Sequence, residues 1–245
     1  MLILNHKNNK FSFSLLSNPL PRVLKFQKLI HYFKQIPKGH SVLDYGSGDR
    51  PYKKLFLTKF REYIAADFPA TNIKHSIKPD ISIDSDGLIN LPSASVDCVI
   101  LTEVLEHLYK PDSVLKEIYR LLKFDGILVG TVPFVVQEHE QPFDFHRYTY
   151  YCLKKMFEDS EFEIIHLEYV GERIAVAITV FNSVLQIFVK TLRKIKIEIL
   201  ADLLNCIIKI PEFIYLYLKK AGVDVQKVKY FKALPLGYSF YLRKK

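Results

Sequence analysis

A glycine turn behind a buried apolar run is the segment of this sequence best suited to bind a small ligand. The run begins at Ser41 and carries Asp44 near its end, and Gly46 and Gly48 follow two positions apart. Glycine adopts positive φ angles without strain and lets a ligand approach the backbone. Ligands of open α/β sheets bind outside the carboxyl ends of the strands. The pattern therefore predicts a ligand site at residues 44–48.

A second acid stands at the end of the next apolar run. Asp67 follows residues 62–66 and lies 19 positions after Gly48. A carboxylate at this place can accept hydrogen bonds from both hydroxyls of a ribose. Pro51 occupies the position at which a dinucleotide fingerprint has its third glycine, which disfavours a bound pyrophosphate. We therefore expect a nucleoside ligand without phosphates.

Seven apolar runs bounded by Gly, Pro and Asp predict the strands that position these residues. Their ranges are 41–45, 62–66, 80–84, 96–101, 127–132, 162–170 and 236–242. Helical patterns lie between Pro19 and Pro37 and over 103–108, 111–123, 149–158 and 172–220, with a break expected at Pro211. This alternation predicts an α/β fold with a doubly wound, mostly parallel sheet. The helical block 172–220 is expected to be an insertion, because the final strand must return to the sheet.

Length and composition suit one α/β domain with an appendage. The chain has 245 residues, of which 49% are hydrophobic and 25% charged, so it can bury a sizeable core. The three cysteines, Cys98, Cys152 and Cys206, are not spaced as metal ligands or redox pairs. This excludes a disulfide scaffold and a zinc ribbon and indicates a reducing compartment. Residues 1–10 lack the apolar core and cleavage site of a signal peptide.

The net charge of +9 is concentrated near the C-terminus. Residues 1–189 carry 22 Lys and Arg and 22 Asp and Glu, whereas residues 190–245 carry 13 basic and 4 acidic residues. A neutral body with a basic tail predicts an anionic surface as the partner of the tail.

Several motifs occur here in the order in which one enzyme family has them. They are Asp44-Tyr45-Gly46-Ser47-Gly48, the run LPSASVDCVI at 91–100, the run TEVLEHL at 102–108 and the turn Asp125-Gly126. Together they resemble the class I S-adenosylmethionine-dependent methyltransferases, especially the broad type-11 group, over residues 20–170 and the final strand. Asp125-Gly126 departs from the Pro-Gly-Gly that is common in this family, although both are turns. The resemblance implies a Rossmann-like sheet of seven strands with the last one antiparallel.

The resemblance also implies S-adenosyl-L-methionine as the cofactor and a set of residues that bind it. These are Asp44, Tyr45, Gly46, Ser47, Gly48, Asp67, Phe68, Asp84, Ser85, Thr102 and Glu103. In this reading the glycine turn packs against the methionine part, and Asp44 orients the loop or the ammonium group. Asp67 binds the ribose, Asp84 and Ser85 lie beside the adenine, and Thr102 and Glu103 face the methionine end.

The loop after the fifth strand supplies candidates for the base that deprotonates the acceptor. It contains His139 and His146, and His107 lies after the fourth strand; histidine titrates near neutral pH. The alternative is structural, with Asp144 and Arg147 paired to fix the loop and the histidines solvated. Two histidines and three acids in residues 138–146 could also hold a divalent ion, but we expect no metal.

The segment 185–220 combines apolar residues with five cations up to Lys209 and with Tyr215 and Tyr217. Such a basic amphipathic helix can lie in a membrane interface; a cap over the substrate pocket or a homodimer contact is the alternative. The uncharged stretch 174–189 has only 16 residues, so we expect an interfacial helix rather than a span. Nucleic acid is not expected, because the segment is too apolar and no N-P-P-Y-like run follows the fourth strand.

The sequence thus predicts a cytoplasmic transferase, peripheral at the membrane, with a methyltransferase domain in residues 1–171 and 235–245 and a helical insertion or cap in 172–234. The expected acceptor is a hydroxyl or carbon of a small or lipid-linked molecule, saccharide or quinone-like. A dinucleotide-dependent oxidoreductase and a non-catalytic interaction module with this fold are the alternatives.

Overall fold

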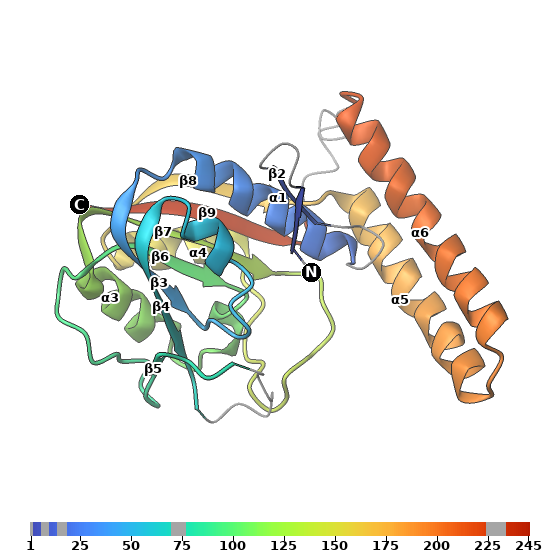
Figure 1. Ribbon diagram of the computed structural model, residues 1–245, viewed down its shortest axis with the longest axis horizontal. Coiled ribbons are helices and arrows are strands. Elements are labelled where there is room, and N and C mark those ends of the chain that lie inside the picture. The colour runs from blue at the N-terminus through green and yellow to red at the C-terminus, as the bar shows by residue number, and fades with distance from the viewer. Residues whose placement is uncertain (1, 6–9, 14–18, 70–76, 224–233) are drawn as a thin grey trace.

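The computed structural model describes residues 2–5, 10–13, 19–69, 77–223 and 234–245 (Figure 1). Its strands are β1 (Leu2–Asn5), β2 (Lys10–Phe13), β3 (Gly39–Tyr45), β4 (Phe60–Asp67), β5 (Ile81–Ser82), β6 (Val96–Thr102), β7 (Leu122–Pro133), β8 (Phe162–Val170) and β9 (Gly237–Lys244). The helices are α1 (Leu20–Gln35), α2 (Lys53–Phe56), α3 (Pro111–Leu121), α4 (Tyr150–Asp159), α5 (Arg173–Lys194) and α6 (Glu198–Lys220), with a 3₁₀ turn, η1, at Leu105–His107.

The main sheet has seven strands in the order β5-β4-β3-β6-β7-β9-β8. Strand β9 pairs antiparallel with β7 and with β8, and the other pairs are parallel. The predicted fold class is therefore confirmed, including the antiparallel last strand. The order of the strands reverses beside β3, and a reversal of this kind opens a crevice at the carboxyl ends of the strands.

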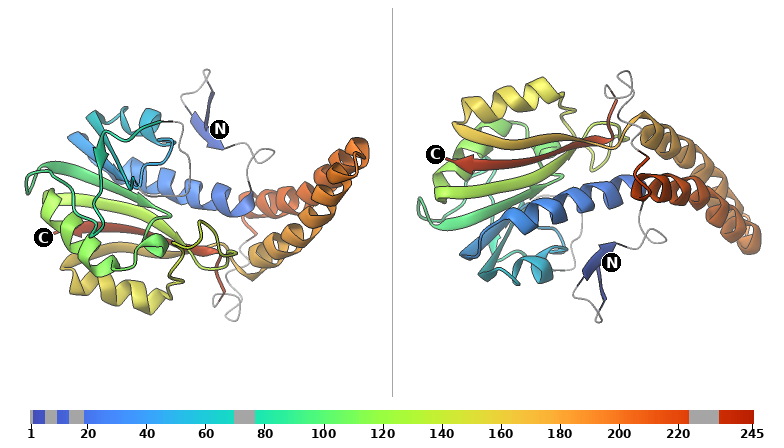
Figure 2. Two further views of the ribbon diagram at one scale, coloured as in Figure 1. Left: turned by 90° about the horizontal axis from the view of Figure 1, so that it is seen from below. Right: turned by 90° about the horizontal axis from the view of Figure 1, so that it is seen from above.

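Helices cover both faces of the sheet, which is why its central strands are apolar without alternation. On one face, α1 and α2 pack on a core that includes Leu29, Phe56 and Val129. On the other, α3 and α4 pack on a core that includes Leu115 and Phe240. Figure 2 shows α1 and α4 on opposite sides of the sheet.

Helices α5 and α6 form an antiparallel pair that projects from the sheet domain (Figures 1 and 2). The pair lies between β8 and β9 in the chain, as the sequence predicted. The chain segments that flank the insertion meet at the sheet, where the Leu236 amide donates to the Val170 carbonyl at 2.9 Å. A small core that includes Leu20, Ala175 and Tyr215 fixes the base of the pair to α1.

The expected break of the helical block at Pro211 is wrong. Helix α6 continues through Pro211. The chain turns instead before the start of α6, where Lys196 has a φ of 63°. Proline removes one amide donor from a helix, but contacts with a neighbour can retain the helix. Here α6 is tied to α5 on both sides of the proline, by Asn205 to Gln186 and by Glu212 to Asn182.

Three further expectations differ in detail. The helix expected over 103–108 is only the turn η1, because Glu103 has a φ of 56° and cannot start a helix. The strand expected over 80–84 is reduced to β5. The β1–β2 pair and the short helix α2 carry no clear sequence pattern and were not predicted.

Candidate active site

A cavity of about 1590 Å³ lies at the carboxyl ends of the parallel strands. Its lining includes the turn at Gly46 to Gly48, Asp67, Phe68, Ser85, Thr102, Glu103, His107 and His139. Pockets for one small ligand are usually about 300–1,000 Å³. The cavity is thus large enough for two molecules side by side.

The backbone of the glycine turn is held against the end of β4. The amides of Gly46 and Ser47 both donate to the Ala66 carbonyl, at 2.9 and 3.0 Å. Gly46 has a φ of 75°, and a Cβ atom there would lie 2.4 Å from Cγ2 of Val104. Glycine is therefore required at position 46 for its backbone angle and for its closeness to η1.

Asp67 ends β4 at the edge of this turn. Its Oδ2 accepts the Gly48 amide at 2.7 Å, and its Oδ1 accepts the Phe68 amide at 2.8 Å. The carboxylate is largely buried but lines the cavity, and carboxylate oxygens have capacity for further donors. Its orientation is fixed without any contribution from a ligand.

Asp44 is buried under the turn. It accepts a hydrogen bond from the Tyr63 hydroxyl. Burial raises the pKa of Asp44 to about 7, although the Tyr63 hydrogen bond and the Arg50 charge oppose this rise and the Asp67 charge adds to it. Asp44 lines the cavity, so its charge can respond to a bound cation near neutral pH.

Asp84 stabilises a turn and does not line the cavity. Its Oδ1 accepts the amides of Asp86 and Leu88 at 3.0 and 2.8 Å. The turn places Ser85 and Gly87 in the cavity wall. The buried Tyr45 hydroxyl donates to the Gly87 carbonyl at 2.8 Å, so Tyr45 supports the same turn from behind.

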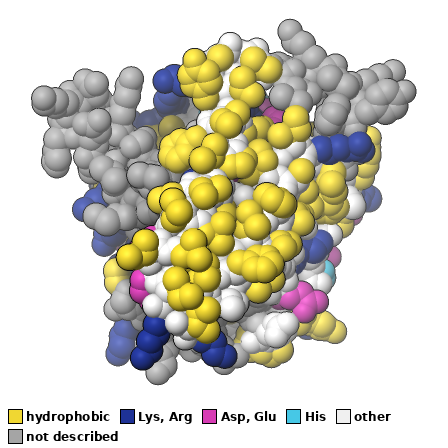
Figure 3. All heavy atoms as spheres, turned by 90° about the vertical axis from the view of Figure 1, so that its right-hand side faces the viewer, with side chains coloured by type: hydrophobic (Ala, Val, Ile, Leu, Met, Phe, Trp, Pro, Cys, Tyr) yellow, Lys and Arg dark blue, Asp and Glu magenta, His cyan; other side chains and the backbone are white. Residues whose placement is uncertain are grey.

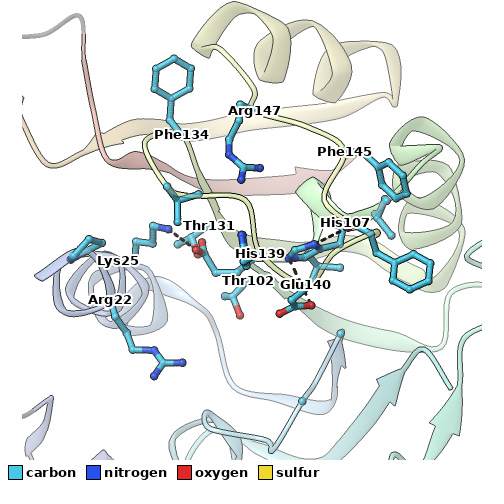
Figure 4. A pocket seen from close by; sticks show the side chains of 18 of the residues that line it. Arg22, Lys25, Thr102, His107, Thr131, Phe134, His139, Glu140, Phe145 and Arg147 are labelled. Atoms are coloured by element: carbon cyan, nitrogen blue, oxygen red, sulfur yellow. Dashed lines mark hydrogen bonds and ion pairs between the residues drawn. The ribbon is translucent and has the colours of Figure 1, made fainter. Parts of the chain in front are cut away.

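Glu103 is the centre of a polar cluster at the end of β6. It forms an ion pair with Lys25 of α1, and its Oε1 accepts the Thr131 hydroxyl at 2.8 Å. Thr102 lines the cavity beside it. Figure 4 shows Lys25 next to Thr131. The cluster places a neutralised carboxylate, rather than a free one, in the cavity wall.

Two of the three candidate histidines contact each other in the cavity wall. The rings of His107 and His139 are 4.8 Å apart, and Figure 4 shows both next to Glu140. Nδ1 of His107 lies 2.8 Å from the Phe143 carbonyl, an acceptor, so this nitrogen carries the proton. Nε2 then has the free lone pair in the neutral ring, and Oε2 of Glu140 is 3.8 Å away. His107 is thus oriented as a base.

The third candidate, His146, does not line the cavity: it packs on Tyr148, and its buried Nε2 has no hydrogen-bond partner among the described residues. The loop between His139 and His146 is fixed by two hydrogen bonds of 2.6 Å from Arg147 to Asp144. This pairing lowers the pKa of Asp144 to about 2.

The structure also brings Glu106 against His107. Both oxygens of Glu106 are buried without a hydrogen-bond partner among the described residues. Burial, then the charge of Glu103, raises the pKa of Glu106 well above its usual range. Ligand atoms of Glu106, His107 and His139 lie within 4.8 Å of one another, a set that suits a divalent ion. That the site works without a metal stays a prediction.

Several residues of the cavity wall were not predicted from the sequence, among them Arg22, Lys25 and Thr131. Only Lys25 left a usable signal, because it stands on the apolar face of α1 between Leu24 and Phe26, where an unpaired lysine is rarely buried.

Comparisons with known proteins agree with this geometry. Residues 20–167 match the model of a family described as a methyltransferase domain. A probable S-adenosylmethionine-dependent methyltransferase of Mycobacterium tuberculosis is 32% identical over 99 residues, which are 39% of this chain and 36% of that protein. The match thus spans about a third of the relative's length.

Solved structures share the fold. A SAM-dependent methyltransferase of Archaeoglobus fulgidus superposes with a TM-score of 0.53 at 15% identity, over 94% of this chain and 96% of that one. The [4+2]-cyclase SpnF does so with a TM-score of 0.55 at 17% identity, over 91% of this chain and 80% of that one. At these identities the likeness concerns the fold alone.

The family match covers more than half of the chain and includes the glycine turn, Asp67 and His107. It favours methyl transfer over the dinucleotide-dependent oxidoreductase. The prediction of a class I S-adenosylmethionine-dependent methyltransferase is confirmed, and the chain belongs to the methyltransferase domain family.

Proposed function

We propose that the protein transfers a methyl group from S-adenosyl-L-methionine to a hydroxyl or carbon of a small or lipid-linked acceptor, saccharide or quinone-like. One observation carries the proposal: a single cavity holds the Gly46–Gly48 turn with Asp67 at one part of its wall and the pair His107 and His139 at another. A nucleoside cofactor and an acceptor can thus lie in contact.

The cofactor would be held by groups that are already oriented. Asp67 would accept the ribose hydroxyls, and the turn that carries Ser85 would lie beside the adenine. Thr102 and Glu103 would face the methionine end, and the buried Asp44 would bind its ammonium directly or through water. The donor supplies a methyl group on a positively charged sulfur, which leaves with its electron pair.

The residues of this chain would then align the acceptor and take its proton. Nε2 of His107 has the free lone pair and accepts the proton as the acceptor oxygen or carbon forms its bond to the methyl group. His139 is the second candidate, since its Nδ1 lies 3.1 Å from the Gln137 carbonyl and its Nε2 is free in the neutral ring. We do not assign this role to His146, because it lies outside the cavity wall.

We further propose that the α5–α6 pair docks on an anionic membrane surface. Its polar contacts lie between the helices, where Asn182 meets Glu212 and Gln186 meets Asn205. Apolar side chains point outward instead, as Figure 3 shows, with Lys and Arg at the margins. They include Phe181, Val184, Ile187, Phe188, Leu203, Ile207, Ile210 and Ile214, each at least 45% exposed. A helix pair in water usually has the opposite arrangement.

Charge complements this apolar face. Lys190, Lys194 and Lys196 lie near the tip of the pair, are exposed and form no ion pair with a described residue. Helix α5 is long and apolar enough to cross a membrane by length and composition, but such a helix is weak support for a span. One-sided apolar faces fit an interfacial position better.

A homodimer that covers this face is the alternative outcome, and gel filtration at increasing concentration would detect it.

The first experiment is calorimetric titration of S-adenosylmethionine and S-adenosylhomocysteine into the protein and into Asp67→Ala. We expect micromolar-range binding that the substitution abolishes, because a buried acceptor of the ribose hydroxyls is lost. Glu62→Ala is the matched control, since Glu62 is an exposed acid on the same strand. Absence of binding to the folded parent would refute the proposal. Binding without turnover on a broad acceptor panel would point to the non-catalytic module.

A further inference from the structure

We infer that the acceptor is an anionic membrane amphiphile, that it enters along α5, and that Arg22 binds its anionic group. This inference rests on the proposed function and names the substrate class of the same site. The cavity continues past the residues expected to hold the cofactor. Its wall also includes Arg22 at the start of α1 and Thr179, Val180 and Ser183 of α5. The cavity therefore opens at the base of the helix pair.

An apolar stripe leads from this opening onto the proposed membrane face. Val180 belongs to the cavity wall and is itself 48% exposed. Val184 and Ile187 follow it at spacings of four and three residues, so the three side chains share one side of the helix. Phe181 and Phe188 flank them and are exposed as well. An apolar chain lying on this stripe would pass from the bilayer to the cavity without leaving an apolar surface.

The cations of the cavity indicate what the head of such a molecule carries. The cavity wall holds four Lys and Arg side chains. Lys25 is neutralised by Glu103 and Arg147 by Asp144, whereas Arg22 on α1 and Lys110 before α3 form no ion pair with a described residue. Arg22 is exposed at the rim and forms neither an ion pair nor a hydrogen bond with a described residue. Figure 4 shows it projecting from α1 on the side of the cavity opposite His107 and His139. An arginine in this position matches a phosphate, sulfate or carboxylate, which it can bind through two parallel N–H groups.

The three features fit one orientation of the acceptor. The apolar chain lies along Val180, Val184 and Ile187, the anionic group meets Arg22, and the group to be methylated extends toward His107. A neutral acceptor would leave Arg22 without a ligand group to bind, and a fully water-soluble acceptor would not use the stripe. The anionic group is therefore expected between the chain and the methylated atom.

The probe is a phosphatidic acid with a diazirine on its acyl chain, presented in neutral detergent micelles and mapped by mass spectrometry after irradiation. We expect labels on α5 within residues 180–188. Arg22→Ala should reduce labelling about tenfold, as loss of a charge-assisted pair does, and Val184→Asn should reduce it several-fold. A diacylglycerol with the same diazirine should label weakly.

Two matched controls separate this site from general adhesion. Lys34→Ala removes an exposed cation from the far end of α1, and Leu203→Asn removes an exposed apolar side chain from α6. Both should leave the labelling in micelles unchanged, whereas Leu203→Asn and Val184→Asn should weaken flotation with vesicles alike. Equal loss of labelling in the controls and the test variants would overturn the inference.

The anionic group of the cofactor, its carboxylate, is the other ligand that Arg22 could bind. Calorimetry on Arg22→Ala distinguishes the two: we expect unchanged affinity for S-adenosylmethionine. Lost cofactor binding with normal photolabelling would assign Arg22 to the cofactor and overturn the inference. Competition by inorganic phosphate as strong as by phosphatidic acid would overturn the lipid part. Neither result affects the proposed methyl transfer, which fails if the unaltered protein does not bind the cofactor or binds it without turnover.

Discussion

At the scale of single residues, Asp44 is the group whose charge should decide how binding depends on pH. Its raised pKa of about 7 means that the carboxyl is protonated in acid, and a bound ammonium favours the ionised form. Affinity for S-adenosylmethionine should rise about tenfold from pH 5.5 to 7, a range in which an α-amino group stays charged. Calorimetry against Asp44→Asn isolates this contribution; the same slope in the variant would contradict it.

The same pKa has a consequence for stability without ligand. The folded state keeps a proton on Asp44 that the unfolded chain releases near pH 4. The folded state therefore binds more protons between about pH 4 and 7, and its free energy of unfolding falls as pH rises through this range. Urea titrations of the parent and Asp44→Asn should show this difference.

His107 provides the second prediction at this scale. The Nδ1 proton of His107 is donated to the Phe143 carbonyl, so Nε2 is the basic atom. His107→Gln removes this base and leaves the cofactor part of the cavity intact. We expect kcat to fall by about 10²–10⁴, the usual contribution of a general base, with little change in cofactor affinity. His139→Gln is the comparison. If only His139→Gln lowers kcat and alters its pH profile, His139 is the base.

At the scale of elements, the glycine turn joins β3 to the packing of η1. Gly46→Ala forces a positive φ on alanine and places its Cβ 2.4 Å from Val104. We expect the free energy of unfolding to fall by about 2–4 kcal/mol, the sum of backbone strain and overpacking. Gly222→Ala is the matched control, since its φ is 82° but nothing lies within 4 Å of the added Cβ. Val104→Ala should partly rescue Gly46→Ala; urea titration measures all three, and equal losses at both glycines would contradict the steric part.

At the scale of the whole molecule, the residues on either side of the helix pair lie next to each other. The Leu236 amide meets the Val170 carbonyl at 2.9 Å, so a short glycine-containing turn can replace residues 172–234. We expect this deletion to keep cofactor binding and to lose flotation with anionic vesicles. The Tm should fall, because Leu20 and Leu24 lose the cover of Val176 and Tyr215. Loss of cofactor binding in a folded deletion would show that the proposed division at 171 and 235 is wrong.

The sequence by itself determined the sheet and the part of the site that depends on the backbone. Apolar runs identified the strands, and the spacing of Gly46, Gly48 and Asp67 placed a ligand at their carboxyl ends, because parallel strands bring these ends together. Such features depend on residues that are close to one another in the sequence. The effect of Pro211 on α6 does not, because it depends on contacts with α5.

Only the tertiary structure decided which polar groups meet. Lys25 and Glu103 are 78 positions apart, and no pattern along the chain couples them. His107 and His139 are brought together by the loop after β7, while His146 in the same loop is turned away. The outward apolar face of α5 and α6 could likewise not be predicted from the sequence, because it depends on which sides of the two helices pair. Distances across the fold depend on packing, and packing is a property of the whole chain rather than of any segment.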